Sequence, residues 1–292
     1  MKIERAHPTG LCFGVRRAIL TVEQTLAEEK IVYALGSPIH NPQEVARLQQ
    51  LGLRVVDGED EVPDGATAFI RAHGVAPAVL ERLRSKNVRV IDGTCPFVRM
   101  VQRRAKELSE SGYHLLLLGD DKHPEVIGIL GCVSGCTTVV SNVDSLLAST
   151  IFADSVKIPK LGLVSQTTQQ ERNLADVAQA AIQKADELRV FNTICHATRE
   201  RQKAVAELSA RVDGMVIIGG HDSANTSKLY RIAGEAGKPV LWIEHAGQLD
   251  RKWVLEKNYI GVAAGASTPD WLIEQSIKAM RDIARTSGGC QL

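Results

Sequence analysis

The chain has 292 residues, of which 44% are hydrophobic, so it is long enough for two or three globular domains and is neither disordered nor fibrous. Its 35 basic and 34 acidic residues give a formal charge of +1, which excludes a general field that would recruit nucleic acid or an acidic membrane. Residues 1–5 carry charges where a signal peptide needs apolar residues, and the longest uncharged run, residues 126–143, is too polar to span a bilayer. We therefore expect a cytoplasmic protein whose partners include neither nucleic acid nor a membrane.

Short β-branched runs alternate with helical patterns along the whole chain. An amphipathic pattern predicts a helix over residues 15–29, Pro77 marks another helix start, and a longer helical pattern covers residues 170–188. The runs that predict strands lie at residues 31–35, 66–70, 88–91, 113–118, 161–164, 215–218 and 259–262. Because the connections between them are too long for hairpins, we predict an α/β fold of parallel sheets with flanking helices.

Three cysteines occupy the same kind of position, where a predicted strand gives way to a helix. Cys95 stands between a glycine–threonine pair and a proline, and Cys12 and Cys195 sit at similar corners. These corners predict three units, at residues 1–94, 95–192 and 193–292. Since ligands bind at the carboxyl ends of strands in open α/β sheets, the three thiols are candidates for a single site.

The three thiols could bind a metal or serve only as small buried hydrophobes. In a reducing compartment, cysteines more often mean metal binding or catalysis than disulfides. They lie far apart in the sequence and none has a Cys-x-x-Cys partner, so no zinc-finger spacing is present. Zinc bound by three cysteines and a histidine is one alternative. The other is an iron–sulfur cluster with three thiolate ligands, whose fourth iron is open to act on a substrate as Lewis acid and electron donor.

Polar side chains follow several other predicted strands. The candidates for an anion site are three histidines and three neutral donors: His40, His73, His123, Ser223, Asn225 and Ser267. Each histidine alone is equally well explained as a hydrogen-bonding loop residue. Their shared position favours phosphate oxygens as ligands, and so does the helix start that Thr268 and Pro269 predict just after Ser267. The chain has neither a P-loop nor a Gly-x-Gly-x-x-Gly pattern, so a nucleotide cofactor is not indicated.

Glu125 and Thr167 are the candidates for proton chemistry. Glu125 follows a His-Pro pair at a predicted helix start, where a carboxylate also stabilises the helix N-terminus. The alternative role is proton delivery beside the metal, assisted by the hydroxyl of Thr167. The residues by themselves leave both roles open.

A set of short motifs, in this order, resembles one enzyme family. The motifs are Gly10-Leu11-Cys12-Phe13-Gly14-Val15, His40-Asn41, Ala72-His73-Gly74-Val75, Thr94-Cys95-Pro96, His123-Pro124-Glu125, Gln166-Thr167-Thr168, Ser223-Ala224-Asn225 and Gly265-Ala266-Ser267-Thr268-Pro269-Asp270. From Cys12 to Asp270 the chain is similar to the 4-hydroxy-3-methylbut-2-enyl diphosphate reductase family. The set as a whole, more than any one motif, carries the resemblance.

The resemblance implies a trefoil of three α/β domains around a central cavity, with an oxygen-sensitive 4Fe-4S cluster held by Cys12, Cys95 and Cys195. It also implies the last step of the methylerythritol phosphate route to isoprenoids. In that step, two electrons and two protons remove the allylic hydroxyl of the substrate and give isopentenyl and dimethylallyl diphosphates.

The resemblance also implies roles for the other candidates. The residues that would bind the diphosphate are His40, His73, His123, Ser223, Asn225 and Ser267. Glu125 and Thr167 would act on the hydroxyl and its proton. A ferredoxin or flavodoxin would donate the electrons.

The chain departs from the family pattern in two places. Ala224 stands where the family has a serine, so one phosphate hydrogen bond is expected to be absent or to come from Thr226 or a water. Cys132, Cys136 and Cys290 lie outside the motifs. We expect them to serve in packing, with a regulatory disulfide or a second metal as the alternative.

Two other functions are compatible with the sequence. One is a divergent paralogue that acts on another phosphorylated allylic substrate, for which Ala224 is the only hint. The other is a non-catalytic sensor that binds a cluster or zinc. A sensor needs neither Glu125, nor Thr167, nor a diphosphate pocket, so their joint presence favours the reductase.

Overall fold

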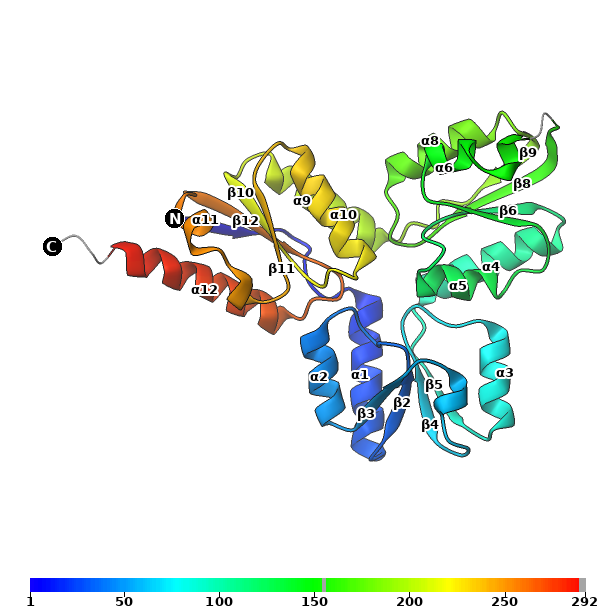
Figure 1. Cartoon of the computed structure of the whole chain (residues 1–292), viewed down its shortest axis with the longest axis horizontal. Coiled ribbons are helices and arrows are strands. Elements are labelled where there is room, and N and C mark those ends of the chain that lie inside the picture. Colours follow the sequence, from blue (N-terminus) through cyan, green and yellow to red (C-terminus); the bar gives the residue numbers. More distant parts are fainter. Residues whose placement is uncertain (154–155, 289–292) are drawn as a thin grey trace. The chain divides into compact units, whose positions relative to one another are not determined.

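The structure is a computed structural model that describes residues 1–153 and 156–288. Within these residues the strands form three four-stranded sheets, and every strand pair is parallel (Figure 1). Each sheet is flanked by helices. The predicted α/β class with three small parallel sheets is therefore confirmed. None of the described helices is long and apolar enough to cross a membrane.

Sheet A joins the N-terminal strand to the last third of the chain. Its order is β1 (Lys2–Arg5), β12 (Tyr259–Ala264), β10 (Gly214–Ile218) and β11 (Val240–Ile243). Its helices are α9 (His196–Ser209), α10 (Ala224–Glu235), α11 (Arg251–Leu255) and α12 (Asp270–Gly288), with a 3-10 turn at Ala246–Gln248. One core contains side chains of α9 and α10, and the other contains side chains of α11 and α12. Both faces of the sheet are thus buried, as is usual for parallel sheets.

Sheet B has the order β3 (Leu53–Val56), β2 (Val32–Leu35), β4 (Thr67–Ile70) and β5 (Arg89–Asp92). Its helices are α1 (Phe13–Glu28), α2 (Pro42–Gln50) and α3 (Pro77–Ser85), with a 3-10 turn at Glu59–Glu61. One face packs against α1 and α2, and the other face packs against α3. The alternation of the strand side chains between these two cores explains why β4 is buried along its whole length.

Sheet C has the order β7 (Thr137–Val140), β6 (His114–Leu118), β8 (Ile158–Ser165) and β9 (Ala185–Val190). Its helices are α4 (Pro96–Glu110), α5 (Pro124–Leu130), α6 (Val143–Leu147), α7 (Thr150–Ala153) and α8 (Glu171–Ala181). Side chains of α4 and α5 fill the core on one face, and those of α6 and α8 fill the core on the other.

The chain forms two compact units, which are described separately below. Unit 1 comprises residues 1–16, 39–47 and 196 onward, and it contains sheet A. Unit 2 comprises residues 17–38 and 48–195, and it contains sheets B and C. The boundaries of the three predicted domains, 1–94, 95–192 and 193–292, stay a prediction. Strand β1 nevertheless pairs with β12, so the first residues belong to the sheet of the C-terminal part.

Two local predictions differ from the structure. The helix expected over residues 170–188 ends at Ala181, and β9 follows, because this segment forms an exposed edge strand whose many charged residues obscure a strand pattern. The hydroxyl of Thr268 does not cap a helix. It donates to the carbonyl oxygen of Ile218 at 3.0 Å, and α12 begins at Asp270.

Two of the three cysteines outside the motifs lie in a described loop. Cys132 and Cys136 fall in the loop between α5 and β7, as the glycines around them predict. The thiol of Cys132 donates to the carbonyl oxygen of Gly128 at 3.3 Å, and burial raises its pKa. Cys290 lies outside the described residues.

Candidate functional site

In unit 2, five candidate residues follow strands at the carboxyl edges of the two sheets. His73 follows β4 and Cys95 follows β5 in sheet B, while His123, Thr167 and Cys195 follow β6, β8 and β9 in sheet C. This placement is dictated by parallel pairing, because all strands of a parallel sheet end at the same edge. The predicted position of these candidates at strand exits is therefore confirmed.

Glu125 and Thr167 form a buried pair in unit 2. The hydroxyl of Thr167 donates to Glu125 Oε2 at 2.8 Å, and the backbone N–H of Thr167 donates to Glu125 Oε1 at 2.7 Å. Glu125 is only 1% exposed. Two directed donors thus fix both oxygens of a carboxylate that is shielded from bulk water.

His123 is oriented by the start of α5, which explains why it stands before a proline. It is the N-cap residue, and its Nδ1 accepts the backbone N–H of Glu125 at 3.1 Å. Because Nδ1 is the acceptor, the ring proton of the neutral imidazole is on Nε2, which becomes a donor. The ring of His73 lies edge-on to that of His123, with 5.1 Å between the centroids.

In unit 2, a backbone hydrogen bond fixes the main chain of each candidate cysteine. The N–H of Cys95 donates to the carbonyl oxygen of Ala72 at 3.0 Å, and that of Cys195 donates to the carbonyl oxygen of Thr167 at 3.0 Å. Cys95 is the N-cap residue of α4, and Cys195 directly precedes α9. Cys95 is therefore fixed next to Ala72, which precedes His73, and Cys195 is fixed next to Thr167.

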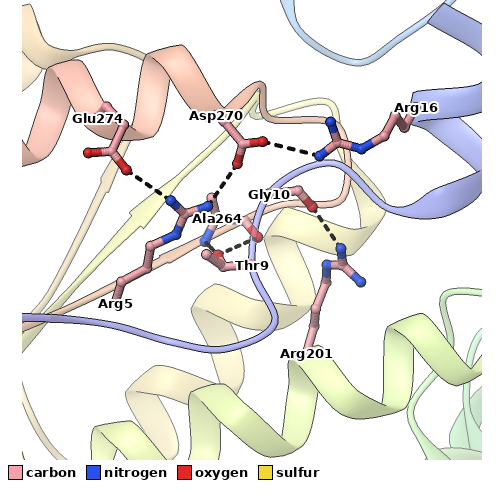
Figure 2. Close-up of polar contacts among 8 residues, drawn as sticks. All are labelled: Arg5, Thr9, Gly10, Arg16, Arg201, Ala264, Asp270 and Glu274. Carbon is pink, nitrogen blue, oxygen red and sulfur yellow. Dashed lines mark hydrogen bonds and ion pairs between the residues drawn. The ribbon is translucent and has the colours of Figure 1, made fainter. Parts of the chain in front are cut away.

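In unit 1, the third thiol lies on a loop that is bound to β12. The N–H of Cys12 donates to the carbonyl oxygen of Ala266 at 3.1 Å. The hydroxyl of Thr9 accepts the N–H of Ala264 at 2.6 Å, as Figure 2 shows. Gly10 between them has a φ of +78°, and a Cβ there would lie 3.0 Å from Ile273 Cδ1. Only glycine adopts this conformation in this space at little cost.

Three arginines and a carboxylate brace the same loop (Figure 2). Arg201, which is 5% exposed, donates to the carbonyl oxygen of Gly10 at 2.8 Å. Asp270 binds Arg5 at 2.8 Å and Arg16 at 3.1 Å. Burial opposes ionisation of Asp270, but the hydrogen bonds from the two arginines outweigh it and lower the pKa of this carboxyl. The loop thus reaches Cys12 in one defined conformation.

The neutral donors of the predicted anion site are brought together at the carboxyl edge of sheet A. Ser223 and Asn225 follow β10, Ser267 follows its neighbour β12, and all three are buried. The Ser223 hydroxyl accepts the N–H of Thr226 at 3.3 Å and caps α10. Both polar side-chain atoms of Asn225 are buried, and neither has a hydrogen-bond partner in the described part of the chain. A buried amide of this kind suits a polar ligand.

His40 also belongs to unit 1, where its Nδ1 lies 3.0 Å from Asp222 Oδ2. Asp222 and Arg201 were not among the predicted site residues. Their loop and helix positions are visible in the sequence, but their contacts join residues 182 and 191 positions apart. No local signal could have found either contact.

The five cysteines of the described segments are thiols outside disulfides. Cys12, Cys95 and Cys195 are half-buried at loop-to-helix junctions, and each is positioned by a backbone hydrogen bond. Soft, thiolate-rich ligand sets select iron–sulfur clusters or zinc, so the chemistry of the three donors fits a cluster.

A family model described as LytB protein matches residues 3–281. The chain belongs to this family. Curated relatives of this chain are named 4-hydroxy-3-methylbut-2-enyl diphosphate reductase. The protein of Aquifex aeolicus (strain VF5) is 42% identical over 281 residues, which cover 95% of each chain. That of Geobacter metallireducens (strain ATCC 53774 / DSM 7210 / GS-15) is 40% identical over 289 residues, covering 98% of this chain and 100% of the relative.

Solved structures of LytB-type reductases are also similar. The E-1-hydroxy-2-methyl-but-2-enyl-4-diphosphate reductase from Plasmodium falciparum matches with a TM-score of 0.88 and 29% identity, covering 95% of this chain and 87% of that chain. The structure of (E)-4-hydroxy-3-methyl-but-2-enyl diphosphate reductase, described as the terminal enzyme of the non-mevalonate pathway, matches with a TM-score of 0.70 and 40% identity. It covers 97% of this chain and 100% of that chain. The predicted family resemblance and the predicted oxidoreductase class are thereby confirmed.

Proposed function

We propose that this LytB protein is a 4-hydroxy-3-methylbut-2-enyl diphosphate reductase. It would remove the allylic hydroxyl of its substrate with two electrons and two protons and give isopentenyl and dimethylallyl diphosphates. The observation that carries the proposal is the buried Glu125–Thr167 pair, with bonds of 2.7 and 2.8 Å, beside thiol corners of the same unit. A carboxylate within hydrogen-bond reach of a hydroxyl supports proton delivery, which a sensor does not require.

Cys12, Cys95 and Cys195 would hold a 4Fe-4S cluster with one open iron. When bound, the cluster would supply the electrons and a Lewis-acidic site for the hydroxyl. The contribution of the chain is to fix the thiols. Arg201 and Gly10 hold the Cys12 loop, and the backbone hydrogen bonds hold the other two thiols.

Glu125 and Thr167 would handle the proton that the departing hydroxyl requires. The Thr167 hydroxyl lies 2.8 Å from Glu125 Oε2, within hydrogen-bond reach for a proton transfer. With Glu125 protonated, its O–H would donate to Thr167 Oγ1; the Thr167 hydroxyl would then give its own proton to the leaving oxygen and take the proton of Glu125. The resulting carboxylate would accept the backbone N–H of Thr167.

The residues proposed to bind the diphosphate are those that the family resemblance implies. His123 presents Nε2–H because its Nδ1 is engaged by the backbone, and His73 lies against it. The further proposed donors are His40, Ser223, Asn225 and Ser267. The buried Nδ2 of Asn225 carries N–H groups that suit phosphate oxygens. Neutral amides, hydroxyls and imidazoles are donors that bind an anion without requiring several buried charges.

The electron donor is proposed to be a ferredoxin or flavodoxin, because the reaction takes electrons one at a time through a cluster. We also retain the cytoplasmic location and the three domains at 1–94, 95–192 and 193–292. A reducing compartment suits an oxygen-sensitive cluster and the thiols of the five described cysteines.

The test is to purify the protein anaerobically, measure iron and sulfide per chain, and assay hydroxyl loss from the allylic diphosphate with a strong one-electron reductant. Near-stoichiometric cluster and conversion to both five-carbon diphosphates are expected. A cluster without turnover would point to a paralogue with another phosphorylated allylic substrate. Zinc in place of iron would overturn the redox mechanism and favour a zinc site without reductase activity.

A further inference from the structure

The loop after β10 carries an acid that the proposed mechanism does not use. Asp222 Oδ2 lies 3.0 Å from His40 Nδ1, and both residues belong to unit 1. The His40 side chain is 13% exposed, whereas that of Asp222 is 64% exposed. A largely solvated carboxylate therefore reaches inward to one nitrogen of a largely buried ring.

The backbone around Asp222 is specified closely enough to aim this carboxylate. A Cβ on Gly220 would lie 2.6 Å from Asp222 Oδ1 and 2.9 Å from the carbonyl oxygen of His40, so the approach of the two segments requires glycine there. The N–H of His221 donates to Glu244 Oε1 at 3.0 Å. The indole N–H of Trp242 donates to the carbonyl oxygen of Gly219 at 2.8 Å. The loop is thus attached to the end of β11 on both sides of Gly220.

His40 and His123 differ in the group that binds Nδ1. In His123, Nδ1 accepts a backbone N–H, so the neutral ring already donates from Nε2. In His40, Nδ1 faces a carboxylate and must carry the proton. The neutral ring would then present a lone pair on Nε2, which repels a phosphate oxygen. Only the imidazolium form of His40 donates from both nitrogens.

The carboxylate of Asp222 carries the negative charge in this contact. The hydrogen bond with His40 is the main reason that the pKa of Asp222 lies below its ordinary value, and the charges of His40 and His221 act in the same direction. Asp222 is therefore ionised at neutral pH. An ionised carboxylate in hydrogen-bond contact favours the charged form of a histidine.

We propose that Asp222 is a positioning residue for the diphosphate site: its carboxylate accepts Nδ1–H of His40 and holds the ring, so that the second nitrogen, Nε2, meets a diphosphate oxygen as a donor when the diphosphate binds. This inference rests on the proposed function, because it takes His40 as a diphosphate donor. It predicts that affinity for the charged end of the substrate, and not the chemical step, depends on Asp222.

The experiment compares Asp222→Asn and Asp222→Ala with the wild type, each as anaerobically prepared holoenzyme at neutral pH. Asparagine keeps an oxygen acceptor for Nδ1–H but removes the charge, and alanine removes both. For Asp222→Asn, the KM for the allylic diphosphate and the Kd for inorganic pyrophosphate, measured by calorimetry, should rise about three- to tenfold. The rise should be larger for Asp222→Ala. In both variants kcat and iron per chain should be unchanged.

The matched control is Glu244→Gln. Glu244 is an exposed carboxylate that binds the same loop through the backbone N–H of His221. Its replacement tests whether the loss of any negative charge near the loop has the same effect. KM and pyrophosphate affinity should stay at wild-type values.

An Asp222→Ala variant with wild-type pyrophosphate affinity would overturn the proposal. A parallel loss of kcat and iron would also overturn it, because it would show a purely structural role. The calorimetry separates this inference from the proposed function. If the wild type binds pyrophosphate but does not reduce the allylic diphosphate, the reductase assignment fails while the effect of Asp222 is still measured. If the wild type does not bind pyrophosphate, the inference fails as well.

Discussion

The candidate residues of the two units differ in how far their hydrogen bonds are completed by the chain itself. In unit 2 the Glu125 carboxylate receives two donors from Thr167. In unit 1 the amide of Asn225 is buried, and no described residue binds either of its polar atoms. Under the proposed function, the Glu125–Thr167 pair would be set before substrate binds, whereas the hydrogen bonds of Asn225 would be completed by the diphosphate. Changes at Glu125 or Thr167 should therefore affect kcat, and changes at Asn225 should affect KM.

The largest expected effect is that of Glu125→Gln. The amide keeps the volume of the side chain and an oxygen for Thr167 but cannot deliver a proton, so kcat should fall by roughly 10²- to 10⁴-fold. Anaerobic turnover with a chemical reductant measures this, and iron per chain should stay at the wild-type level. Glu110→Gln, on the exposed end of α4, is the control. Turnover of Glu125→Gln within a few-fold of wild type would refute the role of the pair.

Asn225→Ala tests the other side of the comparison. Hydrogen bonds to charged groups contribute about 1.5–3 kcal/mol, so the KM should rise by roughly ten- to a hundredfold while kcat changes much less. Asn173→Ala is the control, because that amide binds the carbonyl oxygen of Ser141 away from the candidate residues. A fall of kcat as large as the rise of KM in Asn225→Ala would mean that Asn225 also acts in the chemical step.

Gly10→Ala probes how strongly the Cys12 loop is specified. Both Gly10 and Gly65 have positive φ, but a Cβ on Gly65 would meet nothing within 4 Å, whereas one on Gly10 would meet Ile273, Asp270 and the carbonyl oxygen of Thr268. Gly65→Ala should thus be destabilised only by backbone strain, which lowers the free energy of unfolding by about 1–2 kcal/mol. Gly10→Ala should show a lower Tm than Gly65→Ala and also less iron per chain. Equal Tm and iron in the two variants would show that the loop tolerates a shift.

The smallest expected effect is that of Ala224→Ser. Ala224 is the first residue of α10, between the cap Ser223 and the buried Asn225. A hydroxyl there would add one phosphate hydrogen bond worth about 0.5–1.5 kcal/mol, so the KM should fall by a few-fold. Ala236→Ser, at the exposed C-cap of the same helix, should leave the KM unchanged. An unchanged or higher KM for Ala224→Ser would count against a missing bond.

The strand exits were the most predictable part of the molecule. Central strands such as β6 and β10 are continuous apolar runs because both their faces are buried, and such runs are visible in the sequence. The polar residues that follow them could be placed at sheet edges for the same reason. The edge strand β9 was taken for helix, because its exposed side chains are charged and carry no apolar alternation. The N-terminal strand β1 was missed as well, since its four residues include three charges.

The sequence by itself determined the α/β class, the position of the three thiols at helix starts and the family. These depend on local patterns of apolar residues, prolines and glycines, and on short motifs in a fixed order. Only the tertiary structure decided which side chains meet. The Glu125–Thr167 bond, the Arg201 bond to Gly10 and the His40–Asp222 pair join residues 42, 191 and 182 positions apart. Such contacts follow from strand order and loop conformation, which no local pattern encodes.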